Sequence, residues 1–284
     1  MQKTILSLSP HIRHYEWGSR HVIPEYFGWE VTEEPLAEVW LGAHYQGSSL
    51  LDENRPLSIE IEENPAMWLG KDVSNTFQGR LPFIMKFLAA DLPLSLQVHP
   101  NLSQAQSGYV REGELGLAKE NKQYVDMFDK PEQICAISEM WALIGFREIQ
   151  SARELCQQAG MQNALKQLED FSSGEVFLHI LQDKLHVDVN KILSHLNDSI
   201  PENKWVKQLG GIYPSDLAIV APFFLNLVCI KPGQAIFVES GTAHAYLSGF
   251  GVEVMGASDN VVRAGLTHKK VNLPELATII SLQP

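Results

Sequence analysis

The chain has 284 residues, which is enough for one large domain or two smaller ones, and 45% of them are hydrophobic, as in an ordinary globular protein. The formal net charge of −12 at pH 7 argues against nonspecific nucleic-acid binding, which needs a basic surface. The most apolar stretch, 220–230, is too short to span a bilayer and is interrupted by Pro222 and Asn226. We therefore expect neither a nucleic-acid partner nor a membrane partner.

The spacing of the cysteines indicates the cellular compartment of the protein. Cys135, Cys156 and Cys229 are widely spaced and form no CxxC pair, which disfavours a structural zinc knuckle. An odd number without a pattern is typical of buried thiols in a reducing cytosol. The first ten residues are too poor in apolar side chains for a signal peptide. We expect a cytoplasmic protein that is a monomer.

The first sixty residues predict extended segments and turns, with aromatic residues beside glycines, as at Trp17-Gly18. Strands are expected over 35–40 and, from the alternation of Leu, Ser, Ile, Glu and Ile, over 57–61. Residues 64–70 predict a short helix, because asparagine, proline and glycine stand at its cap, first position and end.

A strand with two chemically different faces is predicted after the apolar run 83–90. In the segment 93–100 three apolar residues alternate with three polar ones, Ser95, Gln97 and His99. A polar face inside a protein needs partners, so a metal or a polar ligand is one interpretation. A strand whose polar face meets solvent is the other.

The next segments contain charged residues that could contribute to the same site. Residues 103–120 are polar and contain several glycines, which predicts a helix followed by a loop. Pro131 makes a rigid turn that sets Lys130 and Glu132 at the entrance of an apolar strand over 133–137. A surface turn is the alternative interpretation.

The hydrophobic period changes near Phe146 and changes back near Leu225. Residues 151–168 and 187–196 have helical spacing, with a break between two helices at Gly160. Strands return over 226–230 and 235–238, and further strands are expected around 241–249 and 251–255. The chain is therefore predicted to be mainly β with an α-helical insertion over 146–222.

Four residues could bind a metal: Gln97, His99, Glu132 and His244. Two imidazoles, a carboxylate and an amide oxygen suit a divalent ion, and these borderline donors favour zinc over magnesium. Cations occur at Lys130, Arg263, Lys269 and Lys270. In an acidic chain such a group next to a metal site suggests an anionic substrate such as a phosphate, whereas a solvated basic turn is the plain alternative.

The sequence resembles the type I mannose-6-phosphate isomerases of the cupin superfamily. The motifs that carry this resemblance appear in family order, and the pairing of Gln97-Val98-His99-Pro100 with a distant His-Ala-Tyr-Leu-Ser-Gly element is specific. The matching stretches are 14–18, 94–100, 129–132, 231–234, 241–249 and 258–267.

The resemblance implies a cupin-type jelly-roll β-barrel, formed by residues 1–145 together with 223–284, as the metal-binding catalytic domain. It implies that the family's carboxy-terminal β domain is largely absent from this chain. It implies that Zn2+ is held by Gln97, His99, Glu132 and His244. It implies that Arg263 is catalytic and that Trp17, Ser95, Lys130, Tyr246, Glu253, Asp259 and Lys269 surround a sugar phosphate. The family usually has proline at the position of His268, which leaves the direction of Lys269 open.

The implied reaction is the interconversion of mannose 6-phosphate and fructose 6-phosphate, in which a proton moves between C1 and C2 through an enediol. Zinc and Arg263 can both stabilise the negative charge that develops on oxygen. Lys269 and Ser95 are candidates for the phosphate. Glu253 is a candidate for the general base, and a metal-bound water is the alternative. A non-catalytic cupin that binds or senses a sugar phosphate, and a metal-dependent oxygenase on the same barrel, are the rival functions.

Overall fold

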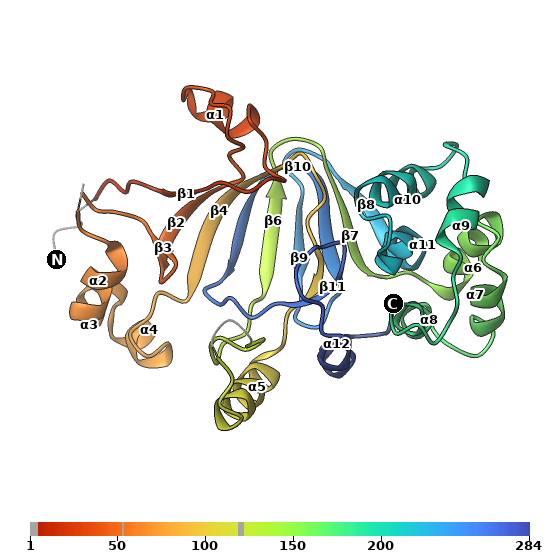
Figure 1. The fold of residues 1–284 in the computed structure, drawn as a ribbon. Helices are drawn as coiled ribbons and strands as arrows, with labels where there is room; N and C mark the ends of the chain where they lie inside the picture. The colour runs from red at the N-terminus through yellow and green to blue at the C-terminus, as the bar shows by residue number, and fades with distance from the viewer. Residues whose placement is uncertain (1–4, 53, 119–121) are drawn as a thin grey trace.

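The computed structural model describes residues 5–52, 54–118 and 122–284. A strongly curved sheet runs through the middle of the molecule, and helices lie at its ends and beyond both of its rims (Figure 1). The strands are β1 (His11–Arg13), β2 (Glu38–His44), β3 (Gly47–Ser48), β4 (Phe83–Ala90), β5 (Leu96–Val98), β6 (Glu132–Ala136), β7 (Met140–Phe146), β8 (Leu225–Ile230), β9 (Ala235–Val238), β10 (His244–Gly256) and β11 (Val262–Gly265).

The helices are spread along the chain. Short helices precede β4, single helices follow β5 and β11, and the remaining helices lie between β7 and β8. They are α1 (Val22–Phe27), α2 (Leu57–Glu63), α3 (Pro65–Leu69), α4 (Lys71–Thr76), α5 (Leu102–Glu114), α6 (Ile149–Gln158), α7 (Gln162–Gln167), α8 (Ser173–Leu181), α9 (Val189–His195), α10 (Pro201–Ile212), the 3-10 turn η2 (Leu217–Val220), α11 (Ala221–Phe224) and α12 (Leu273–Ile279).

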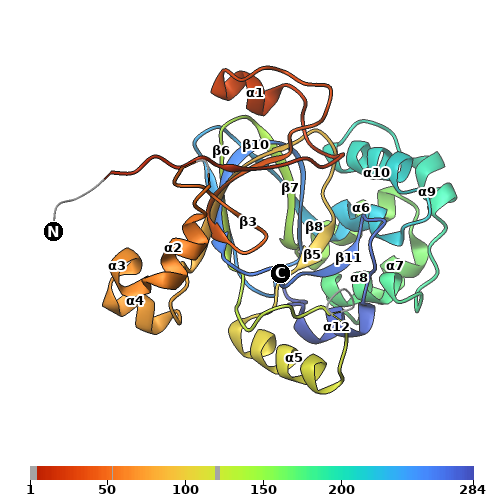
Figure 2. The same cartoon turned by 60° about the vertical axis from the view of Figure 1, so that its left-hand side comes forward.

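Strand β10 is the element that joins the two halves of the sheet. Its first residues pair with β5 and β7, and from Gly249 onward it pairs with β4 and β6. Gly249 has φ +114, and a Cβ atom there would lie 2.6 Å from the carbonyl oxygen of Glu139, so only glycine fits. Because one strand serves both halves, the sheet curves around a common interior (Figure 2).

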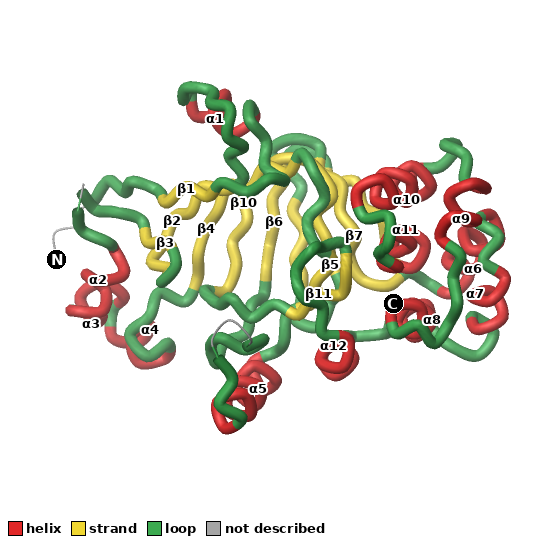
Figure 3. The backbone as a smooth tube through the Cα atoms, viewed as in Figure 1, coloured by secondary structure: helices red, strands yellow, loops and turns green. Residues whose placement is uncertain are grey.

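The largest hydrophobic core lies between the helices from α6 to α11 and the β5–β7–β10–β11 side of the sheet. Phe177 and Phe224 from the helices pack there with Leu96, Leu143 and Leu247 from the strands. The helices of this group gather at one end of the sheet (Figure 3). This core therefore supports β5, β11 and the first part of β10, whereas a smaller cluster packs on β4 and β6.

Much of the predicted order is confirmed. Strands β5, β6, β8 and β9 lie where the alternating patterns indicated, and α6 and α7 are separated at Gly160. Helix α5 begins at a capping box in which Asn101 and Gln104 bond to one another's backbone. Residues 119 and 120 of the predicted segment 103–120 lie outside the described ranges.

Two expectations about the first sixty residues are wrong. Residues 57–61 begin α2 instead of forming a strand, because Leu57 and Ile61 are four apart and both are buried, whereas Ile59 is 47% exposed. The alternation of five residues fitted the helical spacing equally well. A helix, α1, also interrupts the predicted extended region and ends at Gly28 in the left-handed conformation.

The two strands expected around 241–249 and 251–255 are one strand. Gly249 and Gly251 lie inside β10, where they permit close packing on Met140 and its neighbours, and they do not form a turn. The register shifts between Tyr246 and Ser248, which marks a bulge beside the change of partners.

The fold is thus an antiparallel, sheet-rich fold with helices. Within the described ranges every strand pairing is antiparallel, and the hydrogen-bonded path β1-β2-β4-β10-β5-β11 ends at β1 and β11 without closing. In the part of the chain that the structure describes, no helix has both the length and the apolarity to cross a bilayer.

Candidate active site

Two rows of polar side chains cross the sheet, and β10 contributes to both. In the first row Arg263, Gln97 and His244 are Cα partners across β11, β5 and β10. In the second row Lys86 and Glu253 are Cα partners across β4 and β10. Side chains of directly opposed residues lie on the same face, so each row presents its groups together.

The alternation of apolar and polar residues along β5 explains how the polar side chains of the first row are oriented. Leu96 and Val98 are fully buried in the largest core. Because side chains alternate along a strand, Ser95, Gln97 and His99 leave from the opposite face. The sequence pattern of β5 therefore directs these polar groups toward the interior of the curved sheet.

A compact cluster of possible metal ligands forms where β5, β6 and β10 meet. One ligand atom each from His99, Glu132 and His244 lies within 4.8 Å of the others, and all three residues are buried. Glu132 Oε1 is 3.1 Å from His99 Nε2, and Glu132 Oε2 is 3.3 Å from His244 Nε2. The amide of Gln97 lies 3.3 Å from His244 Nε2, and turning it by half a rotation would present its carbonyl oxygen at the same point.

The hydrogen bonds of the two imidazoles fix their tautomers. His99 Nδ1 donates to the carbonyl of Asn260 at 2.8 Å, and His244 Nδ1 donates to the carbonyl of Thr242 at 3.0 Å. Each Nε2 is left with a lone pair directed at the carboxylate of Glu132. Lone pairs and a carboxylate repel unless a cation lies between them, and His99 Nε2 and Glu132 Oε2 have no hydrogen-bond partner among the described residues. The cluster therefore fits a divalent cation.

The protonation states agree with this arrangement. Burial, together with the charge of Lys130, lowers the pKa of His99 to about 4, so the ring is neutral at pH 7, as a metal ligand must be. Burial would raise the pKa of Glu132, but Lys130 and the two histidines hold it well below its usual range. Lys130 Nζ reaches Glu132 Oε1 at 2.9 Å. Glu132 is therefore an anion at the centre of the cluster.

The second row contains a lysine between two carboxylates. Lys86 Nζ lies 3.6 Å from Glu38 Oε1 and 3.9 Å from Glu253 Oε2, and it sits 4.6 Å above the ring of Trp40. Burial alone would lower the pKa of Lys86, but the charges of Glu38 and Glu253 raise it. Burial and the negative charge of Glu132 raise the pKa of Glu253 to about 7. A group with that pKa can both accept and release a proton near neutral pH.

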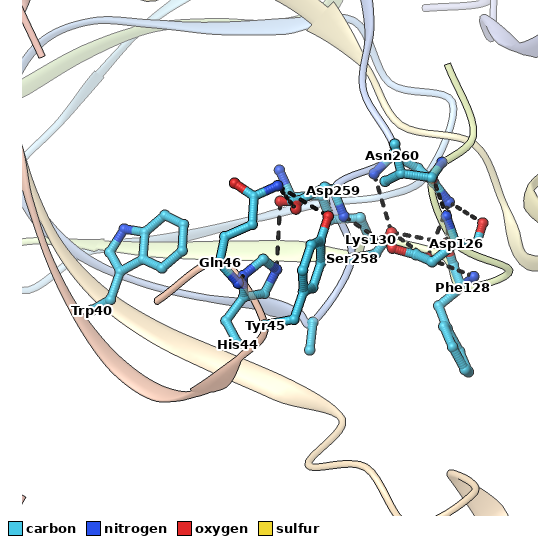
Figure 4. Close-up of polar contacts among 12 residues, drawn as sticks. Trp40, His44, Tyr45, Gln46, Asp126, Phe128, Lys130, Ser258, Asp259 and Asn260 are labelled. Atoms are coloured by element: carbon cyan, nitrogen blue, oxygen red, sulfur yellow. Dashed lines mark hydrogen bonds and ion pairs between the residues drawn. The ribbon is translucent and has the colours of Figure 1, made fainter. Parts of the chain in front are cut away.

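Asp259 lies opposite the hairpin between β2 and β3. Its carboxylate accepts a hydrogen bond from Gln46 Nε2 at 2.6 Å and lies 3.5 Å from His44 Nε2 (Figure 4). Burial and a hydrogen bond to Asp259 raise the pKa of Tyr45 to about 12. Three consecutive side chains of this hairpin thus surround one predicted substrate-binding residue.

Two of the predicted cations lie near one another. Arg263 is half-buried in β11 and burial lowers its pKa. Partial burial and the positive charge of Arg263 lower the pKa of Lys269. Neighbouring like charges are favourable only when an anion joins them, which is the environment that a phosphate group needs. His268 is exposed, and its ring centroid lies 5.4 Å from that of Tyr213.

The remaining predicted site residues lie around this interior. Tyr246 is buried, with its ring 6.2 Å from that of His244, and burial and the charge of Glu253 raise its pKa well above the usual range. Trp17 packs on the cluster that contains Tyr246. Ser95 is partly exposed just before β5, and among the described residues no hydrogen bond joins it to the metal-ligand candidates.

Sequence reasoning missed Lys86, Glu38 and His44. A signal was available for Lys86, because it interrupts an apolar strand at an inward position between Ile84 and Leu88, which are both buried. The ion pairs that make it important come from β2 and β10, and these pairings are not visible locally in the sequence.

Comparison with known proteins gives one consistent result. Residues 5–149 match the family model described as phosphomannose isomerase type I, catalytic domain. The chain is 34% identical over 300 residues to the mannose-6-phosphate isomerase of Salmonella typhimurium and 35% identical over 299 residues to that of Escherichia coli. Each alignment covers 100% of this chain and 75% of the relative. A crystal structure of zinc-bound mannose 6-phosphate isomerase superposes with a TM-score of 0.88 at 33% identity, covering 98% of this chain and 75% of the other.

Proposed function

The chain belongs to the type I phosphomannose isomerases, and from this premise we propose how its residues perform the reaction. It is a zinc-dependent aldose–ketose isomerase that interconverts mannose 6-phosphate and fructose 6-phosphate. The observation that carries this conclusion is the buried cluster of His99, Glu132 and His244, whose inward atoms need a cation.

We propose Gln97, His99, Glu132 and His244 as the residues that hold the zinc ion. Two neutral imidazoles, one carboxylate and one amide oxygen match the donors that zinc accepts. A bound zinc ion would supply positive charge that stabilises negative charge developing on a substrate oxygen. Lys130 balances the charge of Glu132 at 2.9 Å, and we propose that it also contacts the sugar.

Proton transfer is assigned to the second row. The reaction removes a proton from the carbon next to a carbonyl group and returns it to the neighbouring carbon. We propose that the carboxylate of Glu253 accepts and returns this proton, because its pKa of about 7 suits both directions. Lys86, 3.9 Å away, keeps the ionised form available inside the protein.

Arg263 and Lys269 are proposed to act on the two negatively charged parts of the substrate. Arg263 stands in the same row as Gln97 and His244, so its guanidinium is proposed to stabilise the enediolate oxygen. Lys269 and Ser95 are proposed to bind the phosphate. Trp17, Tyr246 and Asp259 are proposed to line the sugar between these ends.

The finer architecture is also a proposal. The curved antiparallel sheet of residues 1–145 and 223–284 is proposed to be a cupin-type jelly roll, with 146–222 as a helical insertion. The alternation of strands, helices and strands along the chain supports this division. The half-buried or buried state of all three free thiols supports the proposal of a cytoplasmic protein, and we propose a monomer.

One experiment tests the function. Purified protein is analysed for metal content and is then supplied with mannose 6-phosphate, with the fructose 6-phosphate formed followed by a coupled enzyme assay. The expected result is zinc together with turnover in both directions. Binding of the sugar phosphate with zinc present but without turnover would instead identify a non-catalytic cupin, and iron with oxygen uptake would identify an oxygenase.

A further inference from the structure

Asn260 occupies a position between the metal-ligand cluster and a neighbouring loop. It is 0% exposed, and its main-chain carbonyl accepts the hydrogen bond from His99 Nδ1 at 2.8 Å. This is the bond that fixes the His99 tautomer and leaves Nε2 free to bind a cation. The orientation of one metal ligand therefore depends on where the backbone of Asn260 is held.

The side chain of Asn260 holds that backbone with bonds to the segment 125–128. Its Oδ1 accepts from the backbone N–H of Val125 at 2.8 Å and of Asp126 at 3.3 Å. Its Nδ2 donates to the carbonyls of Asp126 and Phe128, each at 2.9 Å, and lies 3.3 Å from Asp126 Oδ1. Donors face acceptors at both ends of the amide, so only one orientation of the side chain satisfies this environment (Figure 4).

Further hydrogen bonds join the neighbours of Asn260 to the segment 125–128. Ser258 Oγ donates to Asp126 Oδ1 at 2.9 Å, and the backbone N–H of Asp259 donates to Asp126 Oδ2 at 3.2 Å. The segment 125–128 leads directly to Lys130 and Glu132. Asn260 thus links His99, through its main-chain carbonyl, to the segment that leads to Glu132, through its side-chain amide.

We infer that Asn260 is a positioning residue whose side chain fixes the tautomer and direction of His99 toward the metal. Without the amide, the 258–260 segment loses its bonds to 125–128, and the carbonyl no longer has a fixed place opposite Nδ1. The imidazole then spends less time with its Nε2 lone pair directed at the cluster. This inference rests on the zinc site proposed above.

The test is the zinc affinity of Asn260→Ala, measured by competition with a chromogenic chelator. The dissociation constant is expected to rise about 10- to 100-fold, the range found when an outer partner of a metal ligand is changed, because alanine keeps the main-chain carbonyl but removes the side-chain bonds that hold it opposite His99 Nδ1. The absorption spectrum of the cobalt-substituted protein should also change, because the ligand field at His99 is altered. Asn203→Ala, which removes another buried asparagine from α10, is the matched control and should leave both readouts unchanged.

The outcomes separate this inference from its premise. If folded Asn260→Ala protein has a zinc affinity within twofold of the parent, even with a lower melting temperature, the inference is overturned. Asn260 is then a residue that only stabilises the fold. If Asn260→Ala does not fold, Asn260→Asp decides by the same criterion, since it keeps the shape but loses the bonds that Nδ2 donates. His99→Ala is measured in parallel: if it retains full zinc affinity, the proposed zinc site itself fails.

Discussion

Lys86 Nζ lies 3.9 Å from Glu253 Oε2, and the two residues are direct Cα partners across β4 and β10. Glu38 approaches the same ammonium group at 3.6 Å from β2. One buried cation therefore serves two buried carboxylates, and Glu132 adds a third negative charge nearby. Burial raises the pKa of Glu253 most, the negative charge of Glu132 adds to the rise, and Lys86 offsets only part of it.

The raised pKa of Glu253 predicts a pH-dependent stability that a neutral side chain would not have. Its pKa rises from 4.5 to about 7 on folding, so the folded state binds the proton more tightly. The stabilising contribution of that proton is complete below pH 4.5 and is lost as the pH rises through about 7. Relative to the parent, zinc-free Glu253→Gln should therefore gain on the order of 1–3 kcal/mol of unfolding free energy between pH 5 and pH 8.

Urea unfolding of both proteins at several pH values measures this difference. Glu62→Gln, at an exposed position of α2, provides a control for the loss of one carboxylate. A constant difference between the parent and Glu253→Gln from pH 5 to pH 8 would contradict the assigned titration.

The two histidines of the cluster should be needed for zinc. His99→Ala or His244→Ala removes one of the proposed ligands, whose Nε2 atoms lie 3.1 Å and 3.3 Å from the Glu132 carboxylate. Each variant should lose most of its zinc, whereas the parent should hold about one ion per chain. Elemental analysis after dialysis gives the content, with His268→Ala as a control for the loss of an exposed histidine. Full occupancy in both cluster variants would refute the ligand assignment.

The local part of the site could be predicted because one strand encodes it. The alternation along β5 places Leu96 and Val98 in the core and Gln97 and His99 on the other face, and that relation needs no distant contact. Glu132 and His244 are far away in the sequence. Their residue types made them candidate ligands together with Gln97 and His99, but no local pattern shows that β6 and β10 approach β5, so only the resemblance to a known family implied that the four hold one ion.

The errors have equally specific causes. A five-residue alternation cannot distinguish a strand from a helix when its ends are four residues apart, as in α2. The single strand β10 was predicted as two strands because a sequence does not show that Met140 packs against its glycines. Lys86 was overlooked because its role depends on Glu38 and Glu253, which belong to neighbouring strands.

Cys156 should be unreactive in the folded protein. It is fully buried in α6, and burial raises the pKa of its thiol to about 12 although Arg147 opposes the rise. At pH 8 almost no thiolate is present, and thiolate is the reactive form. Alkylation with iodoacetamide followed by peptide mass spectrometry should find Cys156 unmodified in native protein and modified after denaturation. The partly exposed Cys135 and Cys229 serve as internal controls, and rapid native labelling of Cys156 would show that the core around α6 opens.

Arg263 provides the most direct test of the proposed chemistry. Its Cα partner is Gln97, so it belongs to the row that ends at His244, and its guanidinium stays charged even though burial lowers its pKa. If the guanidinium stabilises the enediolate, its interaction is stronger in the transition state than with the bound substrate. Arg263→Ala should then lower kcat by roughly 100-fold or more with a smaller change in KM, by analogy with the loss of one oxyanion donor.

The control variant is Arg263→Lys, which keeps the charge but not the paired donors, and it should recover only part of the rate. Zinc content should be unchanged in both variants, because arginine is not a ligand, and this separates an effect on chemistry from a damaged metal site. If Arg263 binds the phosphate in the ground state, KM should rise while kcat stays near that of the parent. A normal kcat in Arg263→Ala would therefore assign this residue to substrate binding and leave the stabilisation of the enediolate to other groups of the site.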